Sequence, residues 1–258
     1  INGNVDLAVN GTGVLANGGF ATVNINGGGT INIKKNEETA HYAIDAESAT
    51  VNMNMNDERT AAGNNKVNIT GNIGVLNGAV HQNEPNKHSI VNLGLSTADS
   101  TLHGVVVNNF TQENINMGFN GTANFYISNG ATWTNEAWGL PTAGDVGKLF
   151  TGSIVEKLVG GNDKAHAGVI IQKDNNPLTI NNYSGNTTII YAHENDGTKA
   201  TDYKAGDTII NKAQAGSEIT LSTDNKGITM TDSTQVGNVL NALAGKLTYY
   251  ILGVSYRT

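Results

Sequence analysis

A short motif, an asparagine between two aliphatic residues, recurs through the first half of the chain. It occurs at Val23-Asn24-Ile25, Ile31-Asn32-Ile33, Val51-Asn52-Met53, Val67-Asn68-Ile69, Val91-Asn92-Leu93 and Ile115-Asn116-Met117. Alternation of apolar and polar residues is the period of a β-strand, in which successive side chains point to opposite faces. Each motif therefore predicts a strand with its aliphatic residues in a core and its asparagine facing solvent.

The spacing of the motifs favours a β-solenoid. Successive motifs start 8, 20, 16, 24 and 24 residues apart, and all five distances are multiples of four. One side of a β-solenoid coil takes roughly 6 to 8 residues, and a three-sided coil roughly 20 to 24. An antiparallel meander is the alternative, because Asn-Gly is a strong hairpin signal.

The stretch from Ile115 to Thr134 keeps the pattern across its turns. Asn120-Gly121 and Asn129-Gly130 interrupt it, and both residue types tolerate positive φ. Its large apolar residues all have odd numbers: Met117, Phe119, Phe125, Ile127 and Trp133. A period of two that survives a turn predicts strands stacked on one common interior.

Composition supports an all-β fold and restricts the partners. Apolar residues make up 38% of the 258 residues, charged residues only 14%, and there are 32 glycines. Apolar alternation at this level argues against disorder. The net charge of −7, without a basic cluster, argues against nucleic acid and anionic membrane surfaces as partners. No apolar run is long enough to span a membrane. The chain has no cysteine and so forms no disulfides, which a long solenoid does not need.

The chain divides into three parts by residue composition and by the spacing of its apolar residues. Residues 1–145 are Asn- and Gly-rich coils, 146–231 continue the solenoid with protruding loops, and 232–258 form a C-terminal helix and strand. The helix is predicted from the amphipathic spacing of Val236, Val239, Leu240, Leu243 and Leu247, with Asp232 or Ser233 as its N-cap. Such a helix needs an apolar partner, and we expect it to cap the open end of the solenoid.

Sites for catalysis, metals or cofactors are not indicated. The run Gly27–Gly29 lacks the Lys-Ser/Thr of a phosphate loop and leads into a strand, and the spacing of His81 and His88 is not that of metal ligands. The charged groups Asp57-Glu58-Arg59 and Glu194/Asp196 have no third partner in register, and no Gly-x-Ser-x-Gly occurs. We therefore expect no enzyme activity and no cofactor.

Two features are candidates for binding. Trp133 is in phase with Ile127 and is expected in the core, whereas Trp138 is expected at a coil edge, with a sugar-stacking platform as the alternative. The polar loop from His193 to Ala205 is long for an internal turn, and protruding solenoid loops often carry binding.

Several segments in the second half carry a family resemblance. They are Asn129-Gly130-Ala131-Thr132-Trp133, Val169-Ile170-Ile171, Leu178-Thr179-Ile180-Asn181-Asn182-Tyr183-Ser184-Gly185-Asn186-Thr187, Ala205-Gly206-Asp207-Thr208-Ile209-Ile210 and Val236-Gly237-Asn238-Val239-Leu240-Asn241-Ala242-Leu243-Ala244-Gly245-Lys246-Leu247. Together they resemble the passenger region of autotransporter surface proteins from Veillonella-type anaerobic Gram-negative bacteria. The resemblance implies a right-handed parallel β-helix, exported to the cell surface and anchored to the outer membrane by a region outside these residues. Since the chain begins within the pattern at Ile1, we expect it to be a fragment.

The function expected from this resemblance is adhesion, to other bacterial cells, to a host surface or glycan, or to the same protein in a biofilm. We expect an isolated fragment to be a monomer. The predicted adhesive stripe consists of outward-facing asparagines that stacked coils would align: Asn52, Asn54, Asn68, Asn92 and Asn116. The alternatives are that asparagine only solvates the faces, that the β-helix is a polysaccharide-active enzyme, or that the chain is part of a phage fibre.

Overall fold

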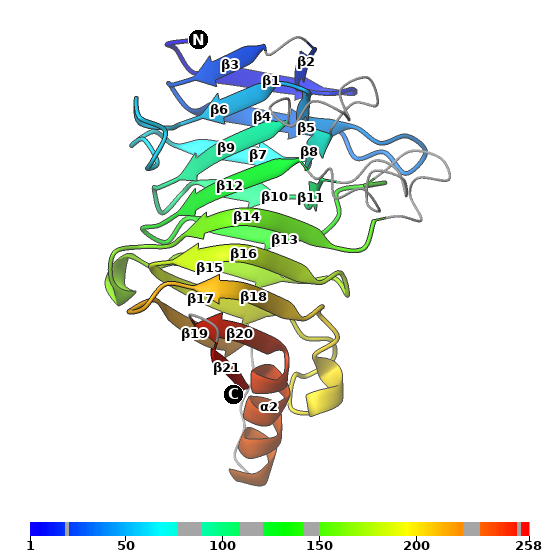
Figure 1. Cartoon of the computed structure of the whole chain (residues 1–258). Coiled ribbons are helices and arrows are strands. Elements are labelled where there is room, and N and C mark those ends of the chain that lie inside the picture. The colour runs from blue at the N-terminus through cyan, green and yellow to red at the C-terminus, as the bar shows by residue number, and fades with distance from the viewer. Residues whose placement is uncertain are drawn as a thin grey trace.

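The computed structural model shows an elongated stack of β-strand coils, with the N-terminus at one end and a helix at the other (Figure 1). It describes residues 1–18, 21–76, 89–108, 121–141, 150–223, 233–251 and 254–257. The strands form three sheets that run along the stack. We call them the front sheet, which faces the viewer in Figure 1, the back sheet behind it and the shorter side sheet.

Each coil contributes one strand to each sheet that it reaches. The back sheet contains β1 (Val5–Val9), β4 (Gly29–Ile33), β7 (Val67–Thr70), β10 (Thr101–His103), β13 (Thr132–Asn135), β15 (Gly168–Gln172), β17 (Asn186–Tyr191) and β19 (Glu218–Thr223). The side sheet contains β2 (Val14–Asn17), β5 (Tyr42–Glu47), β8 (Asn72–Leu76) and β11 (Val106–Val107). The front sheet contains β3 (Thr22–Ile25), β6 (Thr50–Met53), β9 (Ile90–Leu95), β12 (Thr122–Ile127), β14 (Ser153–Val159), β16 (Leu178–Ser184), β18 (Thr208–Ala213), β20 (Leu247–Ile251) and β21 (Val254–Arg257).

The order of the strands defines a parallel β-helix. Up to β12, the chain visits the back, side and front sheets in turn, so each coil has three sides. From β13 to β20 the described strands alternate between the back and front sheets. Strands of successive coils pair in parallel, and only the terminal hairpin of β20 and β21 is antiparallel among the paired strands described. The parallel solenoid is confirmed, and the antiparallel meander is wrong.

The core consists of columns of apolar side chains, one from each coil. In the back sheet the parallel register aligns Leu7, Ile31, Ile69, Leu102, Trp133, Ile170, Ile189 and Leu221. In the front sheet it aligns Ile25, Met53, Leu93, Phe125, Leu158 and Tyr183. Strand alternation therefore becomes a continuous interior, because residues of one phase stack on their equivalents in the next coil.

The inward residues predicted from the motifs are confirmed. Full burial is found for Val51, Met53, Val67, Ile69, Val91 and Leu93, and also for Phe125, Ile127 and Trp133. Trp133 meets Phe125 edge to face, with ring centroids 5.0 Å apart, and donates its indole N–H to the Gly104 carbonyl at 2.9 Å. Ile115, Met117 and Phe119 lie outside the described residues.

The corner between the back and side sheets is shaped by glycine. A Cβ atom on Gly104 would lie 2.1 Å from the Gly71 carbonyl oxygen, and Gly71 itself has φ +144°. Consequently the chain between Leu102 and Val107 turns this corner and forms two short strands, β10 and β11, in place of one continuous strand.

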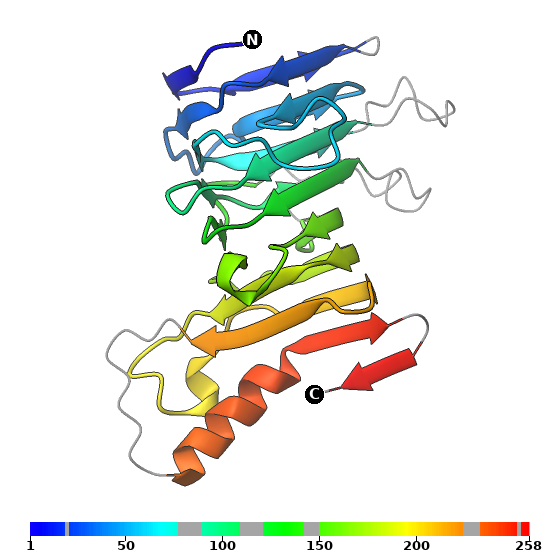
Figure 2. The same cartoon turned by 90° about the vertical axis from the view of Figure 1, so that its left-hand side faces the viewer.

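Helix α2 (Ser233–Gly245) lies at the C-terminal end of the stack, diagonally beneath the last coils in Figure 2. Val239 and Leu243 are its buried residues, and Leu240 is exposed. The helix packs against β19, β20 and the 3₁₀ helix η4 (Ala200–Asp202). A second 3₁₀ helix, η3 (Lys164–His166), follows β14. Asp232, one of the two predicted caps, lies outside the described residues.

Candidate functional site

The front sheet brings two asparagines of the predicted stripe together. Asn24, Asn52, Asn92 and Asn124 occupy one column, and the Nδ2 of each of the last three donates to the Oδ1 of the asparagine one coil earlier. These hydrogen bonds measure 2.8 Å from Asn52 to Asn24, 2.6 Å from Asn92 to Asn52 and 2.8 Å from Asn124 to Asn92. The amides thus satisfy one another within the molecule, as in other stacked asparagine ladders.

A loop covers this asparagine ladder. Residues 54–66, between β6 and β7, fold back over the front sheet, where Arg59 donates to the Asn24 Oδ1 at 3.2 Å. Tyr126 donates its hydroxyl to the Arg59 carbonyl at 3.3 Å. Asn54 starts the loop and donates its amide to the carbonyls of Asn65 and Gly94, at 2.8 and 3.0 Å.

The prediction of a single solvent-facing stripe is therefore wrong for three residues. Asn52, Asn54 and Asn92 are 3%, 0% and 8% exposed, because the loop covers Asn52 and Asn92 and the Asn54 amide turns inward to the Asn65 and Gly94 carbonyls. Asn68 belongs to the back sheet, where it pairs with Thr30 and Thr101, so it cannot join the front column. Asn116 lies outside the described residues.

Trp138 is a packing residue in the structure. It donates its indole N–H to the Ile33 carbonyl at 2.8 Å. Its ring meets the His103 ring edge to face at 4.8 Å, and the Lys35 ammonium lies 5.9 Å from the ring centroid. These contacts come from different coils and hold Trp138 at the coil edge where the sequence places it.

The predicted loop from His193 to Ala205 contributes to a charged hollow of about 530 Å³. Loops that follow β13, β15 and β17 line it with Glu136, Lys173, Asp174, Asn175, Ala192, His193, Glu194, Lys204 and Ala205. Glu136 accepts from Lys173 at 3.0 Å and from His103 at 2.7 Å, and Lys204 pairs with Glu194. Burial opposes ionisation of Glu136, but the hydrogen bonds from Lys173 and His103 hold its pKa below the usual value. The hollow thus carries paired charges of both signs.

The part of the chain that the structure describes contains neither a cluster of metal-ligating side chains nor a helix that could span a membrane. In those residues no three His, Asp or Glu side chains gather in a way that could hold a metal ion. No helix there has the length and apolar character needed to cross a membrane. Asp57, Glu58 and Arg59 are exposed on the loop over the front sheet, Asp196 is exposed, and His81 and His88 lie outside the described residues.

The outer face of the side sheet is largely closed to solvent over β5, β8 and β11, whereas Leu15 on β2 is exposed. Tyr42, Leu76, Val105 and Val107 form a second apolar cluster there, separate from the main core. Asp45 lies on the same sheet and is 6% exposed, and its Oδ1 has no hydrogen-bond partner. Burial, together with the negative charge of Glu47, raises the pKa of Asp45 to about 7.

In the described residues, the outer face of the back sheet is open to solvent on every strand, apart from the contacts that His103 makes with Trp138 and Glu136. Two outward residues per strand form two columns of eight: Asp6, Thr30, Asn68, Thr101, Thr132, Val169, Thr188 and Thr220, and Ala8, Asn32, Thr70, His103, Thr134, Ile171, Ile190 and Ser222. We call these sixteen residues the back face. None of them is buried, whereas the outer faces of the other two sheets include buried residues such as Asp45 and Asn92.

The back face carries almost no charge. From Thr30 to Ser222, across seven strands, it contains no Asp, Glu, Lys or Arg, and half of these fourteen residues are threonine. Charged residues lie at its margins, where Lys66 pairs with Asp99 and Lys164 with Glu218. The outward Thr-x-Thr alternation at Thr132-Trp133-Thr134 is the sequence signal for this face, and it is less frequent than the asparagine motif.

Comparison with protein-family models, with curated proteins and with solved structures found no match to this chain.

Proposed function

We propose that the chain is an adhesive module of a bacterial cell surface, and that its back face associates with the back face of a second copy. The observation that carries this proposal is the open surface of the back sheet, whose two columns contain no Asp, Glu, Lys or Arg from Thr30 to Ser222. Each copy has a net charge of −7, so two copies repel each other over most of their surfaces. The back face is where this repulsion is weakest, and sheets pack face to face readily when side chains of moderate size meet.

The size of the face indicates a weak contact. Seven strands at about 4.8 Å span about 34 Å, and five residues per strand give a width of about 17 Å. Two such faces would bury about 1,150 Å² in total, which is at the lower end for specific interfaces. Isolated copies would then be mostly monomeric, while many copies displayed on two cells would adhere through multivalency. The resemblance to autotransporter passengers supports the location at the cell surface.

The test places charge on the back face. Thr132→Glu and Thr188→Glu lie in one column of the back face, and the matched control carries Thr122→Glu and Thr179→Glu at outward positions of the front sheet. Sedimentation at increasing protein concentration, and aggregation of cells that display the chain, would be measured. We expect the parent and the front-sheet variant to associate and the back-face variant to remain monomeric with an unchanged circular dichroism spectrum. A parent that neither associates in solution nor aggregates cells, or equal loss in both variants, would refute the proposal.

A further inference from the structure

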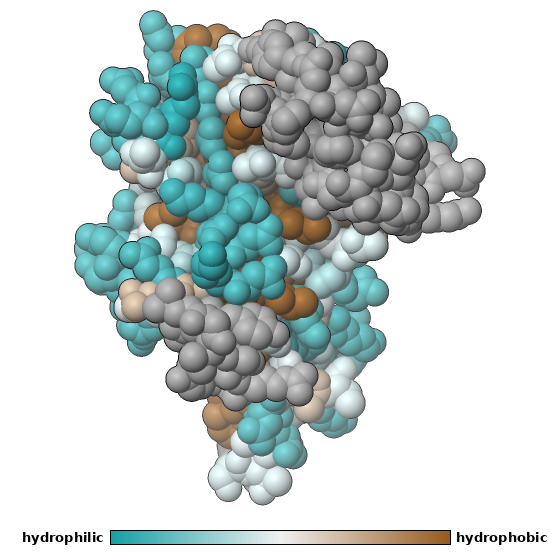
Figure 3. All heavy atoms as spheres, viewed as in Figure 1, coloured by the Kyte–Doolittle hydropathy of each residue, from teal (hydrophilic) through white to brown (hydrophobic). Residues whose placement is uncertain are grey.

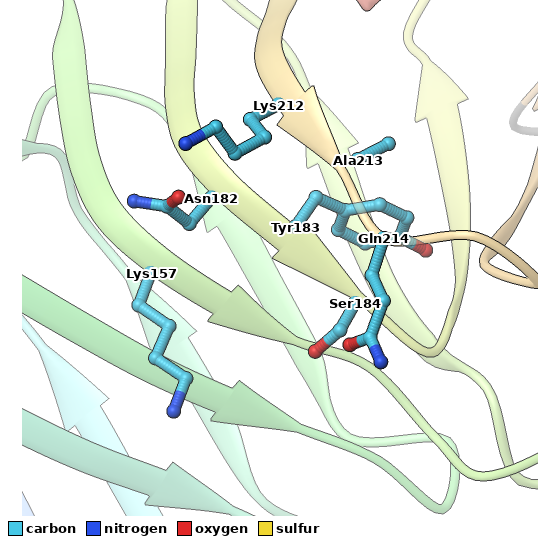
Figure 4. Close-up of a pocket in the computed structure, with 7 residues that line it drawn as sticks. All are labelled: Lys157, Asn182, Tyr183, Ser184, Lys212, Ala213 and Gln214. Atoms are coloured by element: carbon cyan, nitrogen blue, oxygen red, sulfur yellow. The ribbon is translucent and has the colours of Figure 1, made fainter. Parts of the chain in front are cut away.

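A second surface lies on the opposite side of the solenoid, on the C-terminal half of the front sheet. The ladder column continues there from Asn124 to Lys157 and Asn182, and Lys212 follows on β18. A hollow of about 280 Å³ opens among Lys157, Asn182, Tyr183, Ser184, Lys212, Ala213 and Gln214 (Figure 4). The covering loop that closes the ladder in earlier coils does not line this hollow.

The local backbone turns extra polar side chains outward at this place. In β14, β16 and β18 two consecutive residues face away from the core, namely Glu156-Lys157, Asn181-Asn182 and Asn211-Lys212. Strict alternation would place only one of each pair outside. The stacked pairs therefore widen the polar surface of these coils, and hydrophilic residues dominate the face turned to the viewer in Figure 3.

The hollow is lined by cations without partner carboxylates. Neither Lys157 nor Lys212 forms an ion pair within the described residues, and no Asp or Glu lines the hollow. Lys157 extends toward Tyr126, with its ammonium 5.3 Å from the ring centroid. The neighbouring carboxylate, Glu156, accepts hydrogen bonds from Asn181 at 2.7 Å and Asn182 at 2.8 Å, so both its oxygens are engaged. The Lys157 ammonium also donates to the neutral Tyr126 hydroxyl at 3.5 Å, so neither lysine is neutralised by a carboxylate in a protein whose net charge is negative.

Neutral groups complete the lining. Ser184 and Gln214 lie together on the side of the hollow away from the lysines (Figure 4). A hydroxyl and an amide supply both donors and acceptors, which suits the hydroxyl groups of a sugar. The ring of Tyr183 also lines the hollow, and its hydroxyl is held by the Glu218 carbonyl at 2.7 Å.

We propose that this hollow binds an acidic polysaccharide, with Lys157 and Lys212 on successive acid groups and Ser184 and Gln214 on sugar hydroxyls. The two lysines are two strands apart, or about 9.6 Å at the usual strand spacing. A single small anion would engage one of them, whereas an extended chain with an acid on alternate sugars can engage both. The proposal is independent of the self-association above, because the two surfaces lie on different sheets.

The test uses immobilised hyaluronan, which has one carboxylate on alternate sugars, κ-carrageenan, which has one sulfate on alternate sugars, and neutral dextran at physiological ionic strength. Binding of the parent is compared with Lys157→Gln/Lys212→Gln and with Lys34→Gln/Lys199→Gln, a control that removes the same charge from exposed lysines elsewhere. We expect an acidic polymer, but not dextran, to bind the parent, and the first variant to bind about tenfold or more weakly while the control changes less than about twofold. The preferred polymer then identifies the acid group as carboxylate or sulfate.

Two results would overturn this proposal. One is that the parent binds neither acidic polymer more tightly than dextran. The other is that both double variants lose affinity equally, which would indicate a general effect of lysine charge and not a site at this hollow. Because glutamine keeps most of the lysine side chain's length and polarity, both variants are expected to fold, and circular dichroism checks this. Loss of self-association through the back-face substitutions would leave polysaccharide binding intact.

Discussion

Replacement of Asp45 by asparagine should stabilise the protein at neutral and alkaline pH. Asp45 is 6% exposed on β5, and its Oδ1 has no hydrogen-bond partner. That oxygen lies over Gly74 of the neighbouring strand, where a Cβ atom would be only 2.7 Å from it. The site thus holds the side chain closely but gives its charge no compensation, and asparagine removes the charge with almost no change in shape.

The magnitude and sign follow from the pKa. Burial and the charge of Glu47 raise the pKa of Asp45 from 3.8 to about 7. Because the folded state binds the proton more tightly than the unfolded state, its stability falls as the pH rises from about 4 to about 7 and stays lower above that. A shift of roughly three units corresponds to on the order of 4 kcal/mol, which is an upper value because local water entry would relieve part of it.

The assay is chemical denaturation of parent and Asp45→Asn, followed by circular dichroism at pH 4 and pH 8. The difference between the two proteins should be small at pH 4 and should reach about 2 to 4 kcal/mol in favour of the variant at pH 8. Asp57→Asn, at an exposed loop carboxylate, serves as the control and should change stability by less than about 0.5 kcal/mol at either pH. The reasoning fails if Asp45→Asn is no more stable than the parent at pH 8, or if its advantage is the same at both pH values.

Two further predictions concern stability. Asn92→Leu should lower the free energy of unfolding by about 1 to 3 kcal/mol, since the Oδ1 of Asn52 loses its donor from Asn92 and the Asn124 amide loses its acceptor; an unchanged melting temperature would show that the ladder does not stabilise the fold. Deletion of residues 232–251 removes α2 and β20 and should expose the strand edges of the last coils, so we expect oligomers or precipitate by light scattering. A monomeric deletion variant would contradict the capping role of the helix.

The sequence by itself determined which residues are strands and which side chains point inward. That information is local, because the strand backbone alternates its side chains with a period of two whatever its neighbours are. Val51, Met53, Phe125 and Trp133 are therefore in the core, as their phase predicted. The lack of charge on the back face was also present in the sequence, but it becomes visible only when residues from eight strands are placed side by side.

The tertiary structure decided which strands share a sheet and which faces stay open. Asn52 and Asn68 have the same local motif, yet they lie on the front and back sheets, because the lengths of the intervening loops set where each coil turns. Whether an outward residue meets solvent depends on a distant segment, such as the loop at residues 54–66 that covers Asn52 and Asn92. The same holds for the polar core: Asn135 is fully buried because Gln172 and Ser153 of neighbouring strands supply hydrogen bonds at 2.6 Å. A buried amide is tolerated only with such partners, and partners 18 and 37 residues away are supplied by the fold rather than by any local pattern.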